Sequence, residues 1–112
     1  MIRTACFTAL CILACQGSAL AHPPSAIDAK IAGTGVTVTV RHGVNDPTDH
    51  YIKYIKVTVN GTKAEERIFS AQTDGSRQLV PFDIPTLKPG DTVTVEAACS
   101  RAGELQKDFT VK

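Results

Sequence analysis

"YIKYIKVTVNGTKAEERIFS", residues 51–70, has the pattern of a β-hairpin in which Asn60-Gly61 joins two strands. Asn-Gly is a strong short-range hairpin signal, because a tight type I′ turn requires a positive φ at both central residues. The run before it is rich in β-branched and aromatic residues, which favour strands, and the run after it carries the charges that an edge strand needs. Asn60, Gly61 and Thr62 also match a glycosylation sequon, and we interpret them as the turn.

The same alternation with a period of two continues along the chain, and no stretch shows a convincing helical period. Short strand-like runs are separated by closely spaced turn signals. This pattern predicts an all-β fold, an immunoglobulin-like antiparallel β-sandwich of about seven strands. Pro81 predicts an edge position or a bulge for its strand, because proline cannot donate to a sheet. The predicted strands are residues 26–32, 36–41, 51–59, 62–70, 78–84, 92–99 and 105–111.

Residues 1–21 have the pattern of a secretory signal peptide. One positive charge is followed by the apolar run "ACFTALCILAC" and by the small-residue segment "QGSALA". The apolar run is too short to cross a bilayer as a helix, so no membrane span is predicted. We expect cleavage after Ala21 and a secreted or periplasmic protein that begins at His22. A lipidated N-terminus at Cys15 is a second interpretation, although Leu13 fits a lipobox poorly.

The segment from His22 to Lys112 has the size of a single small domain. The chain carries 12 basic and 11 acidic residues, and removal of Arg3 lowers the formal net charge from +1 to zero. No basic patch stands out, which argues against nucleic acid and against an anionic membrane surface as partners. The sequence does not indicate an oligomeric state.

Cysteine usage leaves one thiol in the predicted mature chain. Of the 4 cysteines, Cys6, Cys11 and Cys15 lie in the predicted leader, and Cys99 remains. The mature chain is therefore expected to have no internal disulfide. A leftover thiol in an exported protein is exposed to oxidation unless it is buried or held by a metal.

Two of the 3 histidines flank the loop in "RHGVNDPTDHY", residues 41–51. If each strand runs opposite to the preceding one, every histidine and the remaining cysteine fall at one pole of the sandwich. Imidazole nitrogen and thiolate sulfur suit iron, copper or zinc, and do not suit calcium or magnesium. The sequence therefore predicts a metal site whose ligands are His22, His42, His50 and Cys99.

The loop between His42 and His50 contains further candidates for this site. Pro47 fixes its own φ and restricts Asp46, which stiffens the loop and holds the two rings apart. Asp46 or Asp49 is expected to orient a histidine ring through a hydrogen bond. Taken singly, each histidine also fits a solvated polar residue, and the cysteine fits a small core residue. Their convergence favours the metal site.

Four segments resemble the iron domain of the superoxide reductase (desulfoferrodoxin) family: "HPP" at His22, "RH" at His42, "DHYIKYIKVTVNG" from Asp49 and "AACSRAG" around Cys99. The resemblance implies an immunoglobulin-like sandwich with a mononuclear ferrous centre, four equatorial histidines and an axial cysteine thiolate. In this family the sixth iron position accepts superoxide, which is reduced to hydrogen peroxide. An external electron donor then reduces the iron again.

The resemblance assigns as iron ligands His22, His42, His50 and Cys99. The fourth histidine of the family lies three residues after the cysteine, where this chain has Ala102. The family's lysine before the first histidine, which helps to attract superoxide, is replaced by Ala21, and Gly43 replaces a proline in a longer loop. The resemblance therefore implies the fold more strongly than the activity.

Three functions fit these residues. The leading interpretation is an exported mononuclear metal-binding domain with iron, which is a superoxide-reductase-like oxidoreductase if the site turns over. The second is a periplasmic copper-binding protein in which the amine and imidazole of His22 chelate copper together with His42 or His50, and zinc is a further alternative metal. The third is a non-catalytic sandwich that binds a protein or carries a sulfur compound on Cys99.

Overall fold

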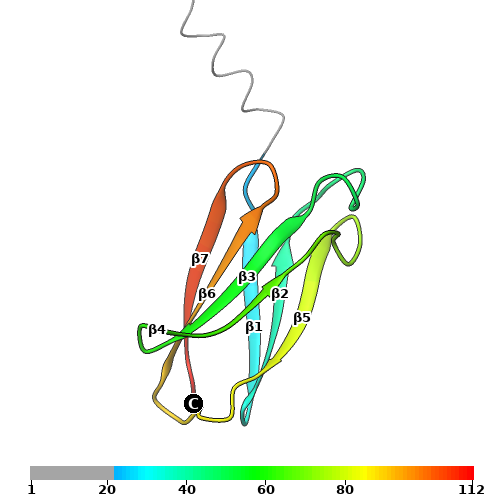
Figure 1. Cartoon of the computed structure of the whole chain (residues 1–112). Coiled ribbons are helices and arrows are strands. Elements are labelled where there is room, and N and C mark those ends of the chain that lie inside the picture. The colour runs from blue at the N-terminus through cyan, green and yellow to red at the C-terminus, as the bar shows by residue number, and fades with distance from the viewer. Residues whose placement is uncertain (1–21) are drawn as a thin grey trace, which may run out of the picture.

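The computed structural model describes residues 22–112 as two β-sheets packed face to face (Figure 1). The predicted leader, residues 1–21, and the alternative lipidation at Cys15 lie outside the described residues. Within the described part, no helix is long and apolar enough to cross a membrane. The seven strands confirm the predicted all-β, immunoglobulin-like sandwich. They are β1 (Ala26–Ala32), β2 (Gly35–Arg41), β3 (Ile52–Val59), β4 (Thr62–Ile68), β5 (Arg77–Asp83), β6 (Thr92–Cys99) and β7 (Glu104–Thr110).

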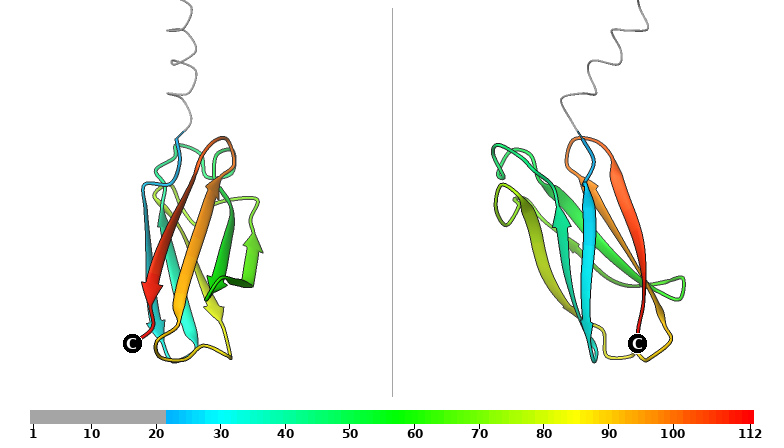
Figure 2. Two further views of the ribbon diagram at one scale, coloured as in Figure 1. Left: turned by 90° about the vertical axis from the view of Figure 1, so that its left-hand side faces the viewer. Right: turned by 180° about the vertical axis from the view of Figure 1, so that it is seen from behind.

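The two sheets differ in the number of strands. One sheet has the order β1-β2-β5 and the other has the order β4-β3-β6-β7. All hydrogen-bonded neighbours are antiparallel, and Figure 2 shows the two layers from further sides. β5 lies at the edge of its sheet, as Pro81 predicted. β4 is also an edge strand, and every one of its residues is exposed, which agrees with its charged sequence.

The predicted strand ends differ from the observed ends by at most 2 residues. The pairing of β3 is irregular on both of its sides. The register with β4 shifts between Val57 and Thr58, and the register with β6 shifts between Ile52 and Tyr54. A bulge of this kind adds an unpaired residue and re-aims the neighbouring side chains. The shift between Ile52 and Tyr54 lies at the end of β3 that follows His50.

Asn60 and Gly61 form the predicted turn between β3 and β4, with φ values of 49° and 88°. The Asn60 side-chain nitrogen donates to Oδ1 of Asp91 over 3.0 Å, and its side-chain oxygen accepts from the Thr92 amide over 2.9 Å. The amide group that a glycan would modify is therefore engaged on both sides, which supports our interpretation of the sequon as a turn.

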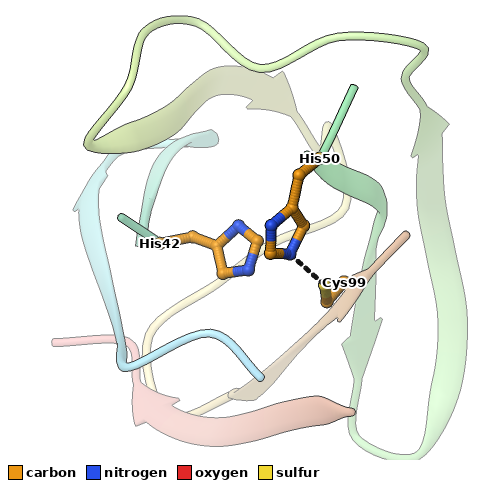
Figure 3. A group of neighbouring side chains, drawn as sticks. All are labelled: His42, His50 and Cys99. Carbon is orange, nitrogen blue, oxygen red and sulfur yellow. Dashed lines mark hydrogen bonds between the residues drawn. The ribbon is translucent and has the colours of Figure 1, made fainter. Parts of the chain in front are cut away.

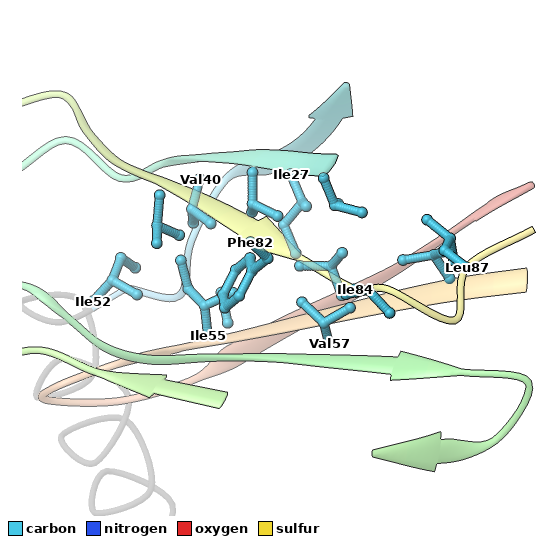
Figure 4. Close-up of a cluster of buried hydrophobic side chains, with 14 of the residues drawn as sticks. Ile27, Val40, Ile52, Ile55, Val57, Phe82, Ile84 and Leu87 are labelled. Atoms are coloured by element: carbon cyan, nitrogen blue, oxygen red, sulfur yellow. The ribbon is translucent and has the colours of Figure 1, made fainter. Parts of the chain in front are cut away.

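The core lies between the two sheets and consists of the inward side chains of the alternating runs (Figure 4). Burial of one such valine or isoleucine side chain contributes about 1.5–3 kcal/mol. The fully buried aliphatic side chains are Val36, Val38, Val40, Ile52, Ile55, Val57, Val93 and Val95. Val36, Val38 and Val40 occupy alternate positions of β2, and the next position of this series is His42. The core face of β2 therefore leads directly to a predicted metal ligand.

The predicted convergence at one pole is confirmed by the arrangement of strand ends. The chain enters β1 at the pole where β2 ends, β3 begins and β6 ends, and the C-terminus lies at the opposite pole (Figures 1 and 2). Strand parity alone therefore predicted correctly which end of the sandwich carries the four candidate ligands.

Candidate metal centre

Three of the four predicted ligands form a compact group at this pole. The ligand atoms of His42, His50 and Cys99 all lie within 4.8 Å of one another, and Figure 3 shows the three side chains pointing toward a common centre. Nitrogen and sulfur ligands bind transition metals at about 2.0–2.3 Å, so two atoms that share one ion are at most about 4.6 Å apart. The group is therefore close to the spacing that a single metal ion requires.

His42 and Cys99 reach the site from the buried faces of their strands. His42 follows β2 and has no exposed surface, and Cys99 ends β6 with 3% of its surface exposed. Val93, Val95 and Ala97 precede the cysteine on the same buried face, as the sequence predicted. These two donors are fixed by the packing of the sandwich core. Burial also shields the thiol from oxidants, which an exposed free cysteine would meet.

The imidazole of His42 is held by the side chain of Gln72, which is itself buried. Nδ1 of His42 lies 2.9 Å from Oε1 of Gln72. The orientation of the Gln72 amide is determined by its nitrogen, which donates to the carbonyl of His42 over 2.8 Å and to the carbonyl of Asp74 over 2.9 Å. Since the oxygen of Gln72 can only accept, Nδ1 of His42 must carry the hydrogen.

The second nitrogen of the His42 ring is left without a donor. Nε2 lies 3.2 Å from the carbonyl oxygen of His22, which cannot donate a hydrogen bond. A neutral ring has one N–H, so it can satisfy the acceptor on one side only. In this tautomer the buried Nε2 has no hydrogen-bond donor among residues 22–112, and its lone pair is open to a metal ion. The neighbouring imidazole and sulfur are further atoms that could hold such an ion.

His50 and Cys99 form a close pair in which Nε2 and Sγ lie 3.0 Å apart (Figure 3). The two atoms share a hydrogen that either of them can carry. The backbone amide of Arg101 also donates to Sγ over 3.3 Å. Burial is the main reason that the pKa of His50 lies below its usual value, and the charges of His42, Arg101 and His22 lower it further. His50 is thus kept neutral at pH 7, the form in which imidazole binds metals.

His22 lies beside this group and is not part of the set within 4.8 Å. Its ring centroid is 5.0 Å from that of His42 and 5.4 Å from that of His50, while the two other rings are 4.8 Å apart. The three imidazoles therefore form one cluster, with the exposed His22 on its outer side. The structure brings all four predicted residues together at one pole, and the ligand atoms of three of them lie within 4.8 Å of one another.

The segment around His22 is positioned by Gly103, which has a φ of +86°. A Cβ atom at Gly103 would lie 2.7 Å from Cβ and 3.1 Å from Cα of Pro23. Only glycine leaves room for this approach and tolerates this φ. The proline ring therefore packs against the turn between β6 and β7, which holds the preceding His22 next to the other two rings.

The prediction that Asp46 or Asp49 orients a histidine ring is wrong, because among residues 22–112 neither carboxylate forms a hydrogen bond with a histidine. Asp46 accepts from the amide and the hydroxyl of Thr48, over 3.0 and 2.6 Å, and these bonds lower its pKa. Asp49 instead forms an ion pair with Arg101. Gln72 orients the ring, and the sequence contained no local signal for it because it lies in an irregular loop 30 residues from His42.

A hollow of about 440 Å³ opens over the imidazole cluster from the side of the β2–β3 loop. It is large enough to admit a small molecule to the ring nitrogens, and it is more polar than the core. The residues that line it are His22, Gly43, Val44, Asn45, His50 and Gly75. Ala102, which occupies the place of the family's fourth histidine, has no donor atom, so it cannot contribute a ligand.

Comparisons with known proteins agree with this architecture. No protein-family model matches the sequence, and no curated protein matches it. Among solved structures, the one-iron superoxide reductase from Giardia intestinalis superposes with a TM-score of 0.63 at 14% identity, over 80% of this chain and 100% of the other. The superoxide reductase neelaredoxin from Archaeoglobus fulgidus in its reduced form gives a TM-score of 0.50 at 20% identity, over 81% of this chain and 89% of the other.

At these identities the comparisons establish the fold. Residues 22–112 have a superoxide-reductase-like β-sandwich, in agreement with the resemblance seen in the sequence. At one pole this sandwich carries a His/His/Cys group with the donor types and spacing of a metal site. The chain thus combines a superoxide-reductase-like fold with a group of side chains that could hold a metal ion.

Proposed function

We propose that this protein is an exported mononuclear iron protein of the superoxide reductase type. The observation that carries the proposal is the group of His42, His50 and Cys99, whose ligand atoms lie within 4.8 Å at one pole of a superoxide-reductase-like sandwich. The unsatisfied Nε2 of the buried His42 supports a cation at this point. Residues 1–21 would direct export, and the mature chain would begin at His22.

The metal would be held by the imidazoles of His22, His42 and His50 and by the thiolate of Cys99. When bound there, ferrous iron supplies one electron to superoxide, which takes up protons to give hydrogen peroxide, and an external donor restores the iron. The combination of neutral imidazoles with one thiolate suits iron, copper and zinc. Iron is proposed because the fold is that of superoxide reductases.

The protein side chains would contribute binding, orientation and charge. The hydrogen shared by His50 and Cys99 must leave before both atoms can act as ligands, and the Arg101 amide stabilises the resulting thiolate. The hollow lined by His22 and His50 would give a small molecule access to the imidazole side of the site. The guanidinium of Arg101 lies close to His50, where its charge is balanced by the carboxylate of Asp49.

Elemental analysis of the secreted protein, purified without oxygen, tests the proposal. The expected result is about one iron per chain, with a visible absorption band that appears when superoxide oxidises the ferrous iron and that changes in Cys99→Ser. A folded protein that carries no metal and shows no affinity for ferrous, cupric or zinc ions would refute the metal site. A loaded iron protein that does not consume superoxide would refute the activity and leave the site intact.

A copper protein is the second candidate, and the position of the His22 backbone favours it. The His22 carbonyl lies 3.2 Å from Nε2 of His42. Both the backbone and the imidazole of His22 therefore lie beside the other candidate ligands. If export frees the amine of His22, amine and imidazole together form a copper chelate. N-terminal sequencing of the exported form and competition between copper and iron discriminate the two candidates. A start at Cys15 or at any residue before His22 would exclude this chelate.

A further inference from the structure

Gln72 is the one side chain that connects the buried His42 to the loop between β4 and β5. It is 6% exposed, and its amide makes three hydrogen bonds: one with the His42 ring, one to the His42 carbonyl and one to the Asp74 carbonyl. Its backbone amide also donates to the carbonyl of Pro47 over 2.9 Å. Gln72 thus bridges the β2–β3 and β4–β5 loops at the metal pole.

The His42 ring has an acceptor on each side. Oε1 of Gln72 lies 2.9 Å from Nδ1, and the carbonyl oxygen of His22 lies 3.2 Å from Nε2. The two neutral tautomers of the ring each satisfy one of these acceptors. With hydrogen on Nε2 the ring would donate to His22, and the nitrogen that faces Cys99 and His50 would be closed to a metal. With hydrogen on Nδ1 it donates to Gln72, and Nε2 stays open.

We propose that Gln72 is a positioning residue that selects the Nδ1–H tautomer of His42 and so keeps Nε2 available as a ligand. Gln72 cannot reverse its amide to suit the other tautomer, because its nitrogen is committed to two backbone carbonyls. The shorter of the two contacts of the ring is also the one to Gln72. The inference rests on the proposed metal site for its functional meaning, while the tautomer itself is a property of the metal-free protein.

The chain offers a matched control for this residue. Gln78 is also 6% exposed and lies near the same loop, where its side-chain oxygen accepts from the Thr73 amide over 3.0 Å. Gln78 makes no hydrogen bond to a histidine among the described residues. Gln72→Leu and Gln78→Leu therefore remove equally buried amides from the same region, and only the first removes a partner of the His42 ring.

The test is ¹⁵N NMR of the imidazole nitrogens in metal-free protein, followed by Zn²⁺ titration. The wild type and Gln78→Leu are expected to show His42 with hydrogen on Nδ1. Gln72→Leu is expected to move the hydrogen to Nε2 and to weaken Zn²⁺ binding about 10–100-fold, the range found when a ligand loses its hydrogen-bond partner. Gln72→Glu keeps an acceptor at Nδ1 and loses the two hydrogen bonds to backbone carbonyls, so retention of the tautomer in this variant assigns it to the acceptor.

Two results would overturn the inference. The first is a wild-type His42 ring that carries its hydrogen on Nε2. The second is a folded Gln72→Leu variant that keeps the hydrogen on Nδ1 and binds Zn²⁺ as tightly as Gln78→Leu. If the wild type binds no metal, the proposed function fails. The tautomer measurement still decides the role of Gln72 in that event, because it is made without metal.

Discussion

Replacement of Gly103 by alanine should damage both the stability of the sandwich and the metal centre. The new Cβ would lie 2.7 Å from Cβ of Pro23, a distance that real Cβ atoms do not adopt, and the obstacle is a rigid ring. A non-glycine residue at a φ of +86° costs about 1–2 kcal/mol, and overpacking adds about 1–3 kcal/mol. If Pro23 moves to relieve the clash, His22 moves with it.

Gly90→Ala is the matched control, because Gly90 has a φ of +92° and a Cβ atom at this position would meet nothing within 4 Å. Both variants incur the backbone cost, and only Gly103→Ala incurs the clash. The difference of about 1–3 kcal/mol corresponds to roughly 5–20 °C in Tm for a domain of this size. Thermal unfolding followed by circular dichroism measures it, and Zn²⁺ titration should show weaker binding only in Gly103→Ala. Equal Tm values and equal affinities in the two variants would refute the role assigned to Gly103.

Three further predictions concern the metal, its ligands and acid stability. Removal of bound metal by a chelator should lower Tm by about 10–20 °C, because free metal at 100 times its Kd stabilises the folded state by about 2.7 kcal/mol. An unchanged Tm would argue against a resident metal. His42→Ala should weaken Zn²⁺ binding by more than the about 10–100-fold that loss of an outer partner causes, and titration of the folded variant at wild-type affinity would contradict its role as a ligand. Asn60 and then Lys88 lower the pKa of Asp91 from 3.8 through hydrogen bonds, so its ionised form stabilises the fold above pH 3.8 and this contribution is lost as pH falls through the lowered pKa. Denaturant unfolding of Asp91→Asn should therefore depend less on pH below 3.8 than the wild type, and identical pH profiles would count against it.

The fold could be predicted because its signals are local. Alternating β-branched residues mark β2 and β6, and Asn60-Gly61 marks the turn between β3 and β4. The location of the four candidate ligands followed from strand parity, since each lies within four residues of a strand end. Cys99 could also be placed on the face of Val93, Val95 and Ala97, which is the buried face of its strand.

The supports of the site could not be predicted because they are contacts between loops. Gln72 lies in a segment with no period, and nothing in its neighbours indicates that it meets a ring 30 residues away. The packing of Pro23 on Gly103 and the ion pair of Asp49 with Arg101 join segments that are far apart in the sequence. Such contacts depend on how the loops fold over the pole, and local propensity carries no information about that.

The four candidate metal ligands are held in two different ways. This difference determines whether a substitution changes the free energy of unfolding, metal binding or both. His42 and Cys99 continue the buried faces of β2 and β6, so their removal disturbs the core as well as the site. His22 and His50 lie outside the strands and are positioned by loop contacts.

The turn from Cys99 to Gly103 supplies one donor, the sulfur, and two supports for the donors on other segments. Arg101 pairs with Asp49 beside His50, and Gly103 admits Pro23 beside His22. Ala102 offers no ligand atom in this turn, and the turn contacts the segments that carry His22 and His50. Substitutions at Arg101 should therefore change metal affinity more than they change the free energy of unfolding, whereas substitutions at His42 should change both.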